Sequence, residues 1–263
     1  DGVAGLTLPF IDAWVLLGRD HGNAVEDALA RLNQGEALGP LNGYHRAMML
    51  DLSGRLDQAT PALAGAMPDA GPAPMRMLQA YASMLARQGR RDEAIEIIRQ
   101  QLAARGEQPV LADLVATLET GGTPEPPFAD PAGGIADALL GIAEALHQER
   151  GNRMAVVYAR LAMFARPDLA EGALLIGEMM AEQGNHDAAI EAYQAVAPDS
   201  PLRYLAELRR AQALHASERQ DEPGWVAPAA GALGLAAAVL AFRGDGSSER
   251  AEREGATPGQ DGA

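Results

Sequence analysis

Two chemically versatile residues are missing from this chain of 263 residues, which contains neither Cys nor Lys. Without Cys, the chain cannot form disulfides, thiolate metal sites or a thiol nucleophile. Without Lys, it lacks the phosphate-binding Lys of a P-loop, the ATP-contacting Lys of a protein kinase and the Schiff-base Lys of a pyridoxal enzyme. A chain without Lys is typical of GC-rich coding, and we expect a bacterial protein.

Aromatic side chains are also scarce, at 4% of the residues, although 48% of the chain is hydrophobic. Ala and Leu carry that apolar content, and both are strong helix formers. The β-branched and aromatic residues that favour strands are few. The composition therefore predicts an all-α protein whose helices pack closely through small side chains.

Positive charge is in deficit, with 21 basic residues against 36 acidic ones and a formal net charge of -15. A nucleic-acid partner requires a basic footprint, so we expect none. The same balance disfavours binding to an anionic membrane surface.

Catalytic motifs are absent from the sequence. It has no HExxH, no GxSxG, and no GxGxxG after a strand. Glu144 and His147 form one ExxH pair, but a di-iron bundle needs two. Carboxylates are too numerous for the sequence to single out an acid pair. We therefore predict a protein that is not an enzyme and has no metal or cofactor.

The sequence pattern of one helical hairpin recurs along the chain. MLARQGRRDEAIEII begins at Met84, MMAEQGNHDAAIEAY begins at Met179, and MLDLSGRLDQATPAL begins at Met49. Each has an apolar helix end, a Gly turn, an Asp and then an Ala that opens a new helix. A fourth copy, from 141 to 167, keeps a spacing of 34 to the last one.

A period of 34 or 35 residues with this pattern resembles the tetratricopeptide repeat (TPR) family. The resemblance covers roughly residues 40 to 217 and rests on small residues in the first helices, turn glycines, Ala openings and bulky residues late in the second helices. These are Ala47, Ala82, Ala143 and Gly177; Gly54, Gly89 and Gly184; Ala59, Ala94, Ala155 and Ala189; and Leu63, Ile98 and Tyr193. The family's large aromatic residue early in the first helix is replaced here by Gly43, Leu78, Leu139 and Ala173.

The pattern has a physical rationale. A small residue lets the partner helix approach closely, and the turn Gly supplies a left-handed helix cap. Asp57, Asp92 and Asp187 lie where a second helix begins, so they can cap it or oppose its dipole. One hairpin cannot bury its apolar stripe alone, which is why it recurs in a stack. We expect an α-solenoid of antiparallel helix pairs, similar to the right-handed TPR superhelix.

The sequence divides into five segments. An N-terminal array at 8–119 contains a degenerate pair at 8–35, TPR-like pairs at 40–71 and 74–106, and a lone helix at 109–119; Trp14 is expected in its core. A Pro/Gly-rich break follows at 120–134, read as a hinge between two arms or as a plain surface loop, and in either case as the segment most exposed to proteases. A second array is expected at 135–222, an apolar Ala/Gly-rich segment at 223–243 and a disordered tail at 244–263.

The apolar segment has three readings. Residues 225–242 carry no charge over 18 residues, which reaches the lower limit for a membrane span. Its Ala, Gly and Pro content favours instead a substitute helix that covers the end of the solenoid. A sequence or reading-frame error is the third reading.

First helices line the inner face of TPR stacks, and in such folds that face binds an extended or helical peptide. The side chains expected to point into it here are Tyr44, Met48, Arg76, Gln79, Arg87, Asp137, Leu140, Glu144, His147, Glu171, Leu174, Glu178 and Glu182. Acids recur at a spacing of 34 on this face, which predicts a basic, partly apolar peptide or protein ligand. An ordinary solvated helix face is the alternative.

These observations predict a non-enzymatic protein-interaction scaffold that binds its partner in a concave groove. The alternatives are the recognition arm of an enzyme whose catalytic domain lies elsewhere, and an envelope assembly factor tethered through 225–242. The chain starts with Asp rather than Met, so we expect a piece of a longer protein. The sequence leaves the bacterial envelope and the cytoplasm equally open.

Overall fold

The computed structural model of the chain describes residues 3–19, 24–32, 39–68, 71–106, 108–149 and 152–217. Within these ranges all regular structure is helical, in twelve helices and no strand, which confirms the all-α prediction. The helices are α1 Val3–Arg19, α2 Val25–Leu32, α3 Gly39–Leu52, α4 Leu56–Ala66, α5 Met75–Arg87, α6 Arg91–Arg105, α7 Pro109–Glu119, α8 Pro131–Gln148, α9 Asn152–Ala165, α10 Ala170–Glu182, α11 His186–Gln194 and α12 Arg203–Ala216.

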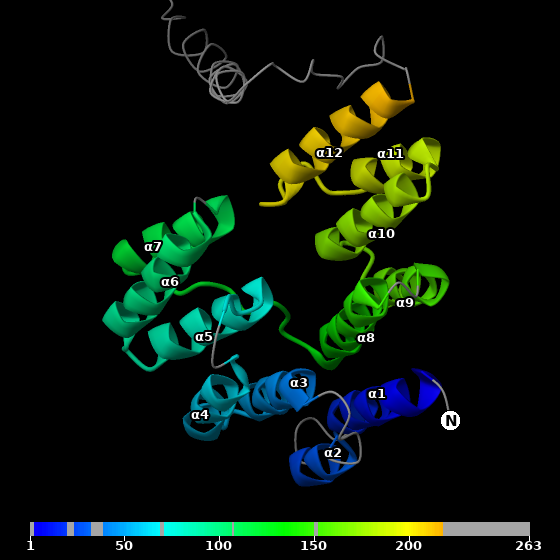
Figure 1. The fold of residues 1–263 in the computed structure, drawn as a ribbon. Coiled ribbons are helices and arrows are strands. Elements are labelled where there is room, and N and C mark those ends of the chain that lie inside the picture. Colours follow the sequence, from blue (N-terminus) through cyan, green and yellow to red (C-terminus); the bar gives the residue numbers. More distant parts are fainter. Residues whose placement is uncertain are drawn as a thin grey trace, which may run out of the picture.

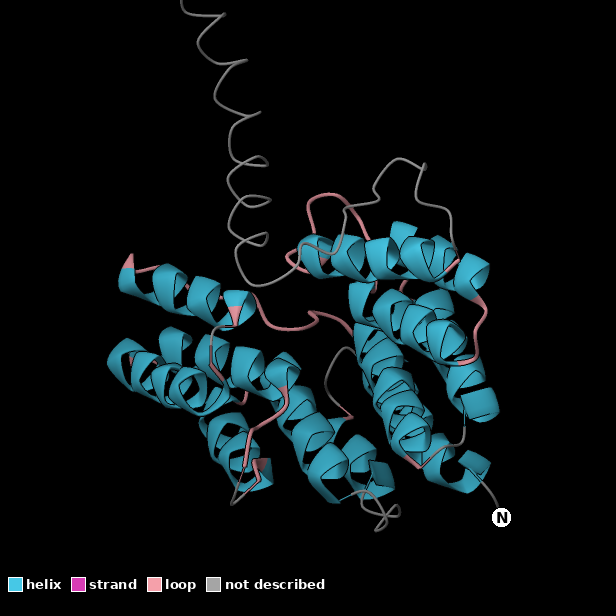
Figure 2. Cartoon of the chain, turned by 45° about the horizontal axis from the view of Figure 1, so that its top comes forward, coloured by secondary structure: helices cyan, strands magenta, loops and turns pink. Residues whose placement is uncertain are grey.

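Helices that follow one another in the chain pack side by side, as α3 does with α4, α8 with α9 and α10 with α11 (Figure 1). Figure 2 shows that helices make up all the regular structure of the described residues. The chain is therefore an α-solenoid built from helix pairs. No single pair could bury its apolar stripe alone, and the buried side chains form one core that runs through all the described helices.

The turn glycines have the conformation that the repeat requires. Gly54, Gly89 and Gly184 have φ of 75°, 76° and 73°, a region that is cheap only for glycine. In each turn the next residue's N–H returns to the preceding helix, as Arg90 N does to Leu85 O at 2.9 Å. The prediction of a left-handed helix end is confirmed at all three places.

The small residues of the repeat also lie where the alignment puts them. The Ala residues that open the second helices, Ala59, Ala94, Ala155 and Ala189, are all buried. The acids near them take only one of their two predicted roles. Asp57, Asp92 and Asp187 lie in the first turn of their helices, where they oppose the helix dipole, but the cap residues are Arg55, Arg90 and Asn185.

The second half of the chain does not stack onto the end of the first half. Helix α8 packs mainly against α9 and α1, although α7 precedes it in sequence. Two arms result, the first formed by α3 to α7 and the second by α8 to α12 (Figure 1). Helices α1 and α2 lie at the base, between the starts of the two arms.

The segment between α7 and α8, here called the linker, is residues 120–130. The sequence predicted a break to 134, which is too long by four residues because α8 begins at Pro131. Asp130 is the N-cap and accepts a hydrogen bond from Gly133 N at 2.7 Å. Gly133 and Gly134 lie inside the helix. A Cβ at Gly133 would come within 2.5 Å of Phe128, and one at Gly134 within 2.4 Å of Trp14, so both positions require glycine for close packing.

Trp14 is completely buried in the core, as predicted. The apolar segment at 225–242 and the tail at 244–263 lie outside the described residues. Among the helices that are described, none combines the length and the hydropathy that a membrane crossing needs.

Candidate functional site: the junction of the two arms

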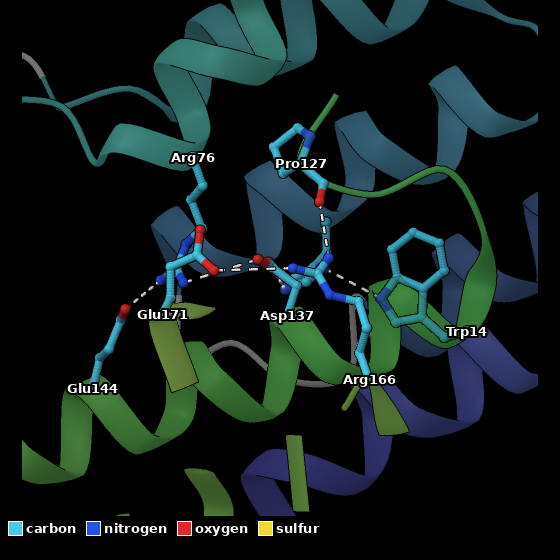
Figure 3. Close-up of polar contacts among 8 residues, drawn as sticks. Trp14, Arg76, Pro127, Asp137, Glu144, Arg166 and Glu171 are labelled. Atoms are coloured by element: carbon cyan, nitrogen blue, oxygen red, sulfur yellow. Dashed lines mark hydrogen bonds and ion pairs between the residues drawn. The ribbon is translucent and has the colours of Figure 1, made fainter. Parts of the chain in front are cut away.

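Charged and polar side chains from both arms meet where α3, α5, α8 and the end of α9 approach one another. We call this set the junction cluster: Tyr44 and His45 on α3, Arg76 on α5, Asp137 and Glu144 on α8, Arg166 just after α9, and Glu171 on α10. Figure 3 shows Arg76 and Arg166 reaching toward the carboxylates of α8 and α10.

Arg76 is the main link between the arms. Its Nη2 donates to Glu144 Oε2, and its Nη1 lies 3.9 Å from Asp137 Oδ1. Burial opposes the charge on Arg76, but the nearby Asp137 and Glu144 prevail and raise its pKa. Because the side chain is only 19% exposed, its charge depends on these two partners.

His45 lies beneath this ion pair in a neutral form. Trp14 Nε1 donates to His45 Nδ1 at 3.2 Å, so the ring proton is on Nε2, which lies 3.7 Å from Asp137 Oδ2. Burial, reinforced by the charge of Arg76, lowers the pKa of His45 to about 3. The imidazole is therefore neutral at physiological pH.

The pKa of Asp137 is shifted in the opposite direction to that of His45. Burial raises its pKa to about 6, with Arg76 and Arg166 pulling it down and Glu144 and Glu171 pushing it up. Burial and the Asp137 charge together also raise the pKa of Tyr44 well above its usual value. The junction can thus take up a proton on Asp137 a little below neutral pH.

Several buried polar atoms of this cluster have no hydrogen-bond partner among the described residues. They are Tyr44 Oη, His45 Nε2, Asp137 Oδ2 and Arg166 Nε. Buried polar atoms normally form hydrogen bonds, and a buried polar atom without one lowers the stability of the fold. Their concentration at the meeting point of the arms marks the junction as more than ordinary core.

The linker runs across what we call the inner surface, the surface between the two arms that carries Gln79 on α5, Arg91 on α6 and Arg166 just after α9. Three side chains hold its backbone carbonyl groups. Arg91 Nε donates to Gly122 O at 3.3 Å, Gln79 Nε2 to Glu125 O at 3.0 Å, and Arg166 Nη1 to Pro127 O at 2.9 Å. Figure 3 shows Arg166 directed at Pro127, which leads toward Trp14.

The end of the linker is anchored by an aromatic contact. Phe128 is 5% exposed and meets Trp14 edge-to-face, with ring centroids 5.4 Å apart. Pro124 is buried as well. The expectation that this segment would be the most exposed to proteases did not foresee these contacts.

The residues predicted for the groove differ in their exposure to solvent. Tyr44, Met48, Asp137 and Leu140 are buried, so a ligand in solution does not reach them in this conformation. Leu174 is half-buried against the core. Five of the thirteen predicted residues come together at the junction cluster, namely Tyr44, Arg76, Asp137, Glu144 and Glu171.

The remaining predicted residues make contacts within the chain or lie on the second arm. Arg87 forms a two-pronged ion pair with Asp51, at 2.8 and 2.6 Å, which ties α5 to α3. Gln79 holds the linker. His147 Nε2 lies 3.6 Å from Glu182, and Arg166 Nη2 lies 4.0 Å from Glu171. Of the five acids in the predicted strip, Glu178 alone is exposed and forms no ion pair with another described residue, so the strip is largely compensated.

A separate shallow depression of about 390 Å³ lies between α10, α11 and α12. Glu178, Glu182, Tyr193 and Arg209 line it among others. Burial, with added repulsion from Glu178 and Glu182, raises the pKa of Tyr193 to about 12, although Arg209 opposes this. Two of the predicted groove residues thus remain accessible on the second arm.

Three components of the site carry no signal in the sequence. Trp14 has the pattern of a core residue, and neither His45 nor Arg166 belongs to a motif. The run of prolines ending in Phe128 could have suggested an extended segment with an aromatic anchor, but its docking surface depends on how the arms fold together. Within the described ranges, no group of three or more His, Asp or Glu residues is placed to hold a metal ion.

No protein-family model matches the chain, and no curated protein matches it. Among solved structures, the chain is similar to the C-terminal part of a TPR repeat-containing protein from Cytophaga hutchinsonii. The two are 14% identical, and the match covers 82% of this chain and 74% of that chain, with a TM-score of 0.30. At that score the molecules do not superpose as wholes, so the solenoid assignment rests on the helices described above.

Proposed function

We propose that this chain is a non-enzymatic protein-interaction scaffold whose inner surface binds an extended peptide. The observation that supports this is that the surface already holds one. Gln79, Arg91 and Arg166 donate hydrogen bonds to three carbonyl groups of the linker, and Phe128 fills an apolar site against Trp14.

The contacts define the ligand class. Donors directed at carbonyl groups read the backbone and not the sequence, while a single buried ring supplies the anchor. Proline favours the extended conformation at low entropic cost, which suits a surface that contacts successive carbonyls. The proposed ligand is therefore an extended, Pro-containing segment that ends in an aromatic residue.

The linker would act as a competitor for that ligand. A tethered segment has an effective concentration on the order of millimolar. A free peptide with only the same contacts would then bind the intact chain weakly. A partner would need further contacts, for which the exposed depression beside Glu178 and Glu182 is available.

The test uses the linker itself as the probe. In one variant, residues 122–129 are replaced by Gly and Ser at equal length, and a fluorescent peptide with the sequence of residues 121–130 is added. We expect saturable binding to this variant, at least about tenfold weaker binding to the unmodified chain, and loss of binding for a peptide in which the Phe is replaced by Ser.

A milder variant, Phe128→Ser, keeps most of the linker in place and serves if the full replacement does not fold. Circular dichroism of both variants should show unchanged helix content. Equal binding of the Phe and Ser peptides, or no binding to either folded variant, would count against the proposal.

A further inference from the structure

The outer side of the second arm carries an apolar stripe that the peptide proposal does not use. Met154, Val157, Leu161 and Phe164 follow one another on α9 at spacings of three, four and three residues. Their exposed fractions are 44%, 47%, 45% and 86%. This is the spacing at which one helix face meets another, and contiguous exposed apolar side chains mark interaction sites.

The charges on α9 itself have one sign. Arg153 and Arg160 lie along its flank and are exposed. Helix α9 contains no Asp or Glu, although the whole chain has a net charge of -15. Within the described part of the chain neither Arg forms a salt bridge, in contrast to Arg76, Arg87 and Arg99.

The stripe is distinct from the inner surface. Helix α9 lies on the side of α8 that faces away from α5 (Figure 1), and Arg166, the residue after its C-terminal end, is the one that reaches the linker. Its buried residues, including Ala155 and Ala159, already pack into the arm. The exposed face therefore has no neighbour among the described helices.

We propose that this face of α9 is a second docking surface, and that its partner is an acidic amphipathic helix of another protein. Such a helix would lay its apolar residues along Met154, Val157, Leu161 and Phe164. Carboxylates beside its apolar face would then meet Arg153 and Arg160. Charge complementarity of this kind speeds encounter and fixes the register of the two helices.

Other occupants fit the charges less well. An anionic membrane is recognised by clusters of about four to eight basic residues, whereas two flank this stripe in a strongly acidic chain. A second copy of α9 would bring its own arginines against these two, because the helix has no acids. The apolar segment at 225–242 has no charge with which to pair them.

The probe is a synthetic helical peptide of about 18 residues, long enough to be partly folded in water. It carries Leu at positions spaced by three, four and three residues, with Glu on both flanks. A matched peptide carries Lys in place of each Glu. We expect the full chain to bind the Glu peptide at least about tenfold more tightly than the Lys peptide.

Two pairs of substitutions locate the site. Leu161→Ser with Phe164→Ser should weaken binding of the Glu peptide by about tenfold or more, and Arg153→Glu with Arg160→Glu should reverse the preference to the Lys peptide. All four side chains are exposed, so the fold should survive. Tyr204→Ser with Leu208→Ser, at comparably exposed positions on α12, is the matched control and should change nothing.

The contrary outcomes are equally definite. Equal affinity for both peptides, binding to neither, or the same loss in the α12 control would overturn the proposal. So would binding to vesicles that contain phosphatidylserine, or concentration-dependent dimerisation, if the Leu161/Phe164 variant abolished it, because the occupant would then be a lipid surface or a second copy.

Discussion

At the scale of single residues, the junction holds two titratable groups that burial moves in opposite ways. The pKa of Asp137 is raised to about 6 and that of His45 is lowered to about 3. Both shifts favour the neutral side chain, as expected for groups removed from water. Their effects on stability have opposite dependence on pH.

Asp137 should stabilise the fold more at low pH. Its pKa is about 6 when folded against 3.8 as the reference, so the stabilisation is fully present below 3.8 and is lost as the pH rises through 6. Asp137→Asn has no such dependence. From pH 4 to pH 7 the wild type should therefore lose about 2.4 kcal/mol relative to this variant, measured by urea unfolding. Asp113→Asn, at an exposed position on α7, is the matched control for removal of one carboxylate.

His45 should show the reverse behaviour. The imidazole stays neutral in the fold while the unfolded chain binds a proton below pH 6.5, so stability is lost as the pH falls from 6.5 toward 3. Relative to His45→Gln, the wild type should lose about 1.4 kcal/mol per pH unit in that range, measured in the same urea series. Between pH 4 and 6 the two residues should nearly cancel, and a His45→Gln curve parallel to the wild type would refute the buried neutral imidazole.

At the scale of helices, close approach between partners depends on residues without a Cβ. In the α10–α11 pair, a Cβ at Gly177 on α10 would lie 2.3 Å from Cε1 of Tyr193 on α11. Tyr193 is buried, so its ring has little room to move. Gly65 on α4 is a useful contrast, because a Cβ there meets nothing within 4 Å.

Gly177→Ala should therefore destabilise the protein by about 1–3 kcal/mol through overpacking. Gly65→Ala should stabilise it by about 0.5 kcal/mol, because Ala reduces the freedom of the unfolded chain. Thermal or urea unfolding of the two variants gives the comparison. Similar effects from both would remove the close α10–α11 contact as the reason for the glycine.

The repeat was predictable because its signals are local. Gly54, Gly89 and Gly184 mark turns through backbone geometry, and a small residue followed by a bulky one marks a helix pair. The start of α8 was missed because Gly133 and Gly134 look like linker residues. Only the positions of Phe128 and Trp14, which are distant in sequence, explain them.

The candidate site was predictable only in part. Face periodicity placed Arg76, Gln79, Asp137 and Glu144 on one predicted groove, and the structure brings Arg76, Asp137 and Glu144 together and puts Gln79 on the linker. It could not show that these residues would meet one another and the linker. That outcome depends on α8 packing against α1, which is a contact between surfaces and not a local pattern.

At the scale of the whole molecule, side-chain contacts and the bound linker both connect the two arms. Arg76 on α5 reaches Asp137 and Glu144 on α8, and the linker is held by Gln79 from one side and by Arg166 from the other. We therefore expect the arms to keep one relative position while the linker stays bound. Replacing the linker should remove one connection and widen the range of positions.

The most direct test is a distance between the arms. Because the chain has no native Cys, spin labels attach only to cysteines that are introduced. Ala112→Cys on α7 and Glu191→Cys on α11 provide one exposed labelling position on each arm. Pulsed electron resonance should give one narrow distance distribution for the labelled chain, a broad one after residues 122–129 are replaced by Gly and Ser, and a narrow one again when the 121–130 peptide is added. A distribution that is already broad with the native linker, or that ignores the replacement and the peptide, would contradict an inner surface closed on an extended segment.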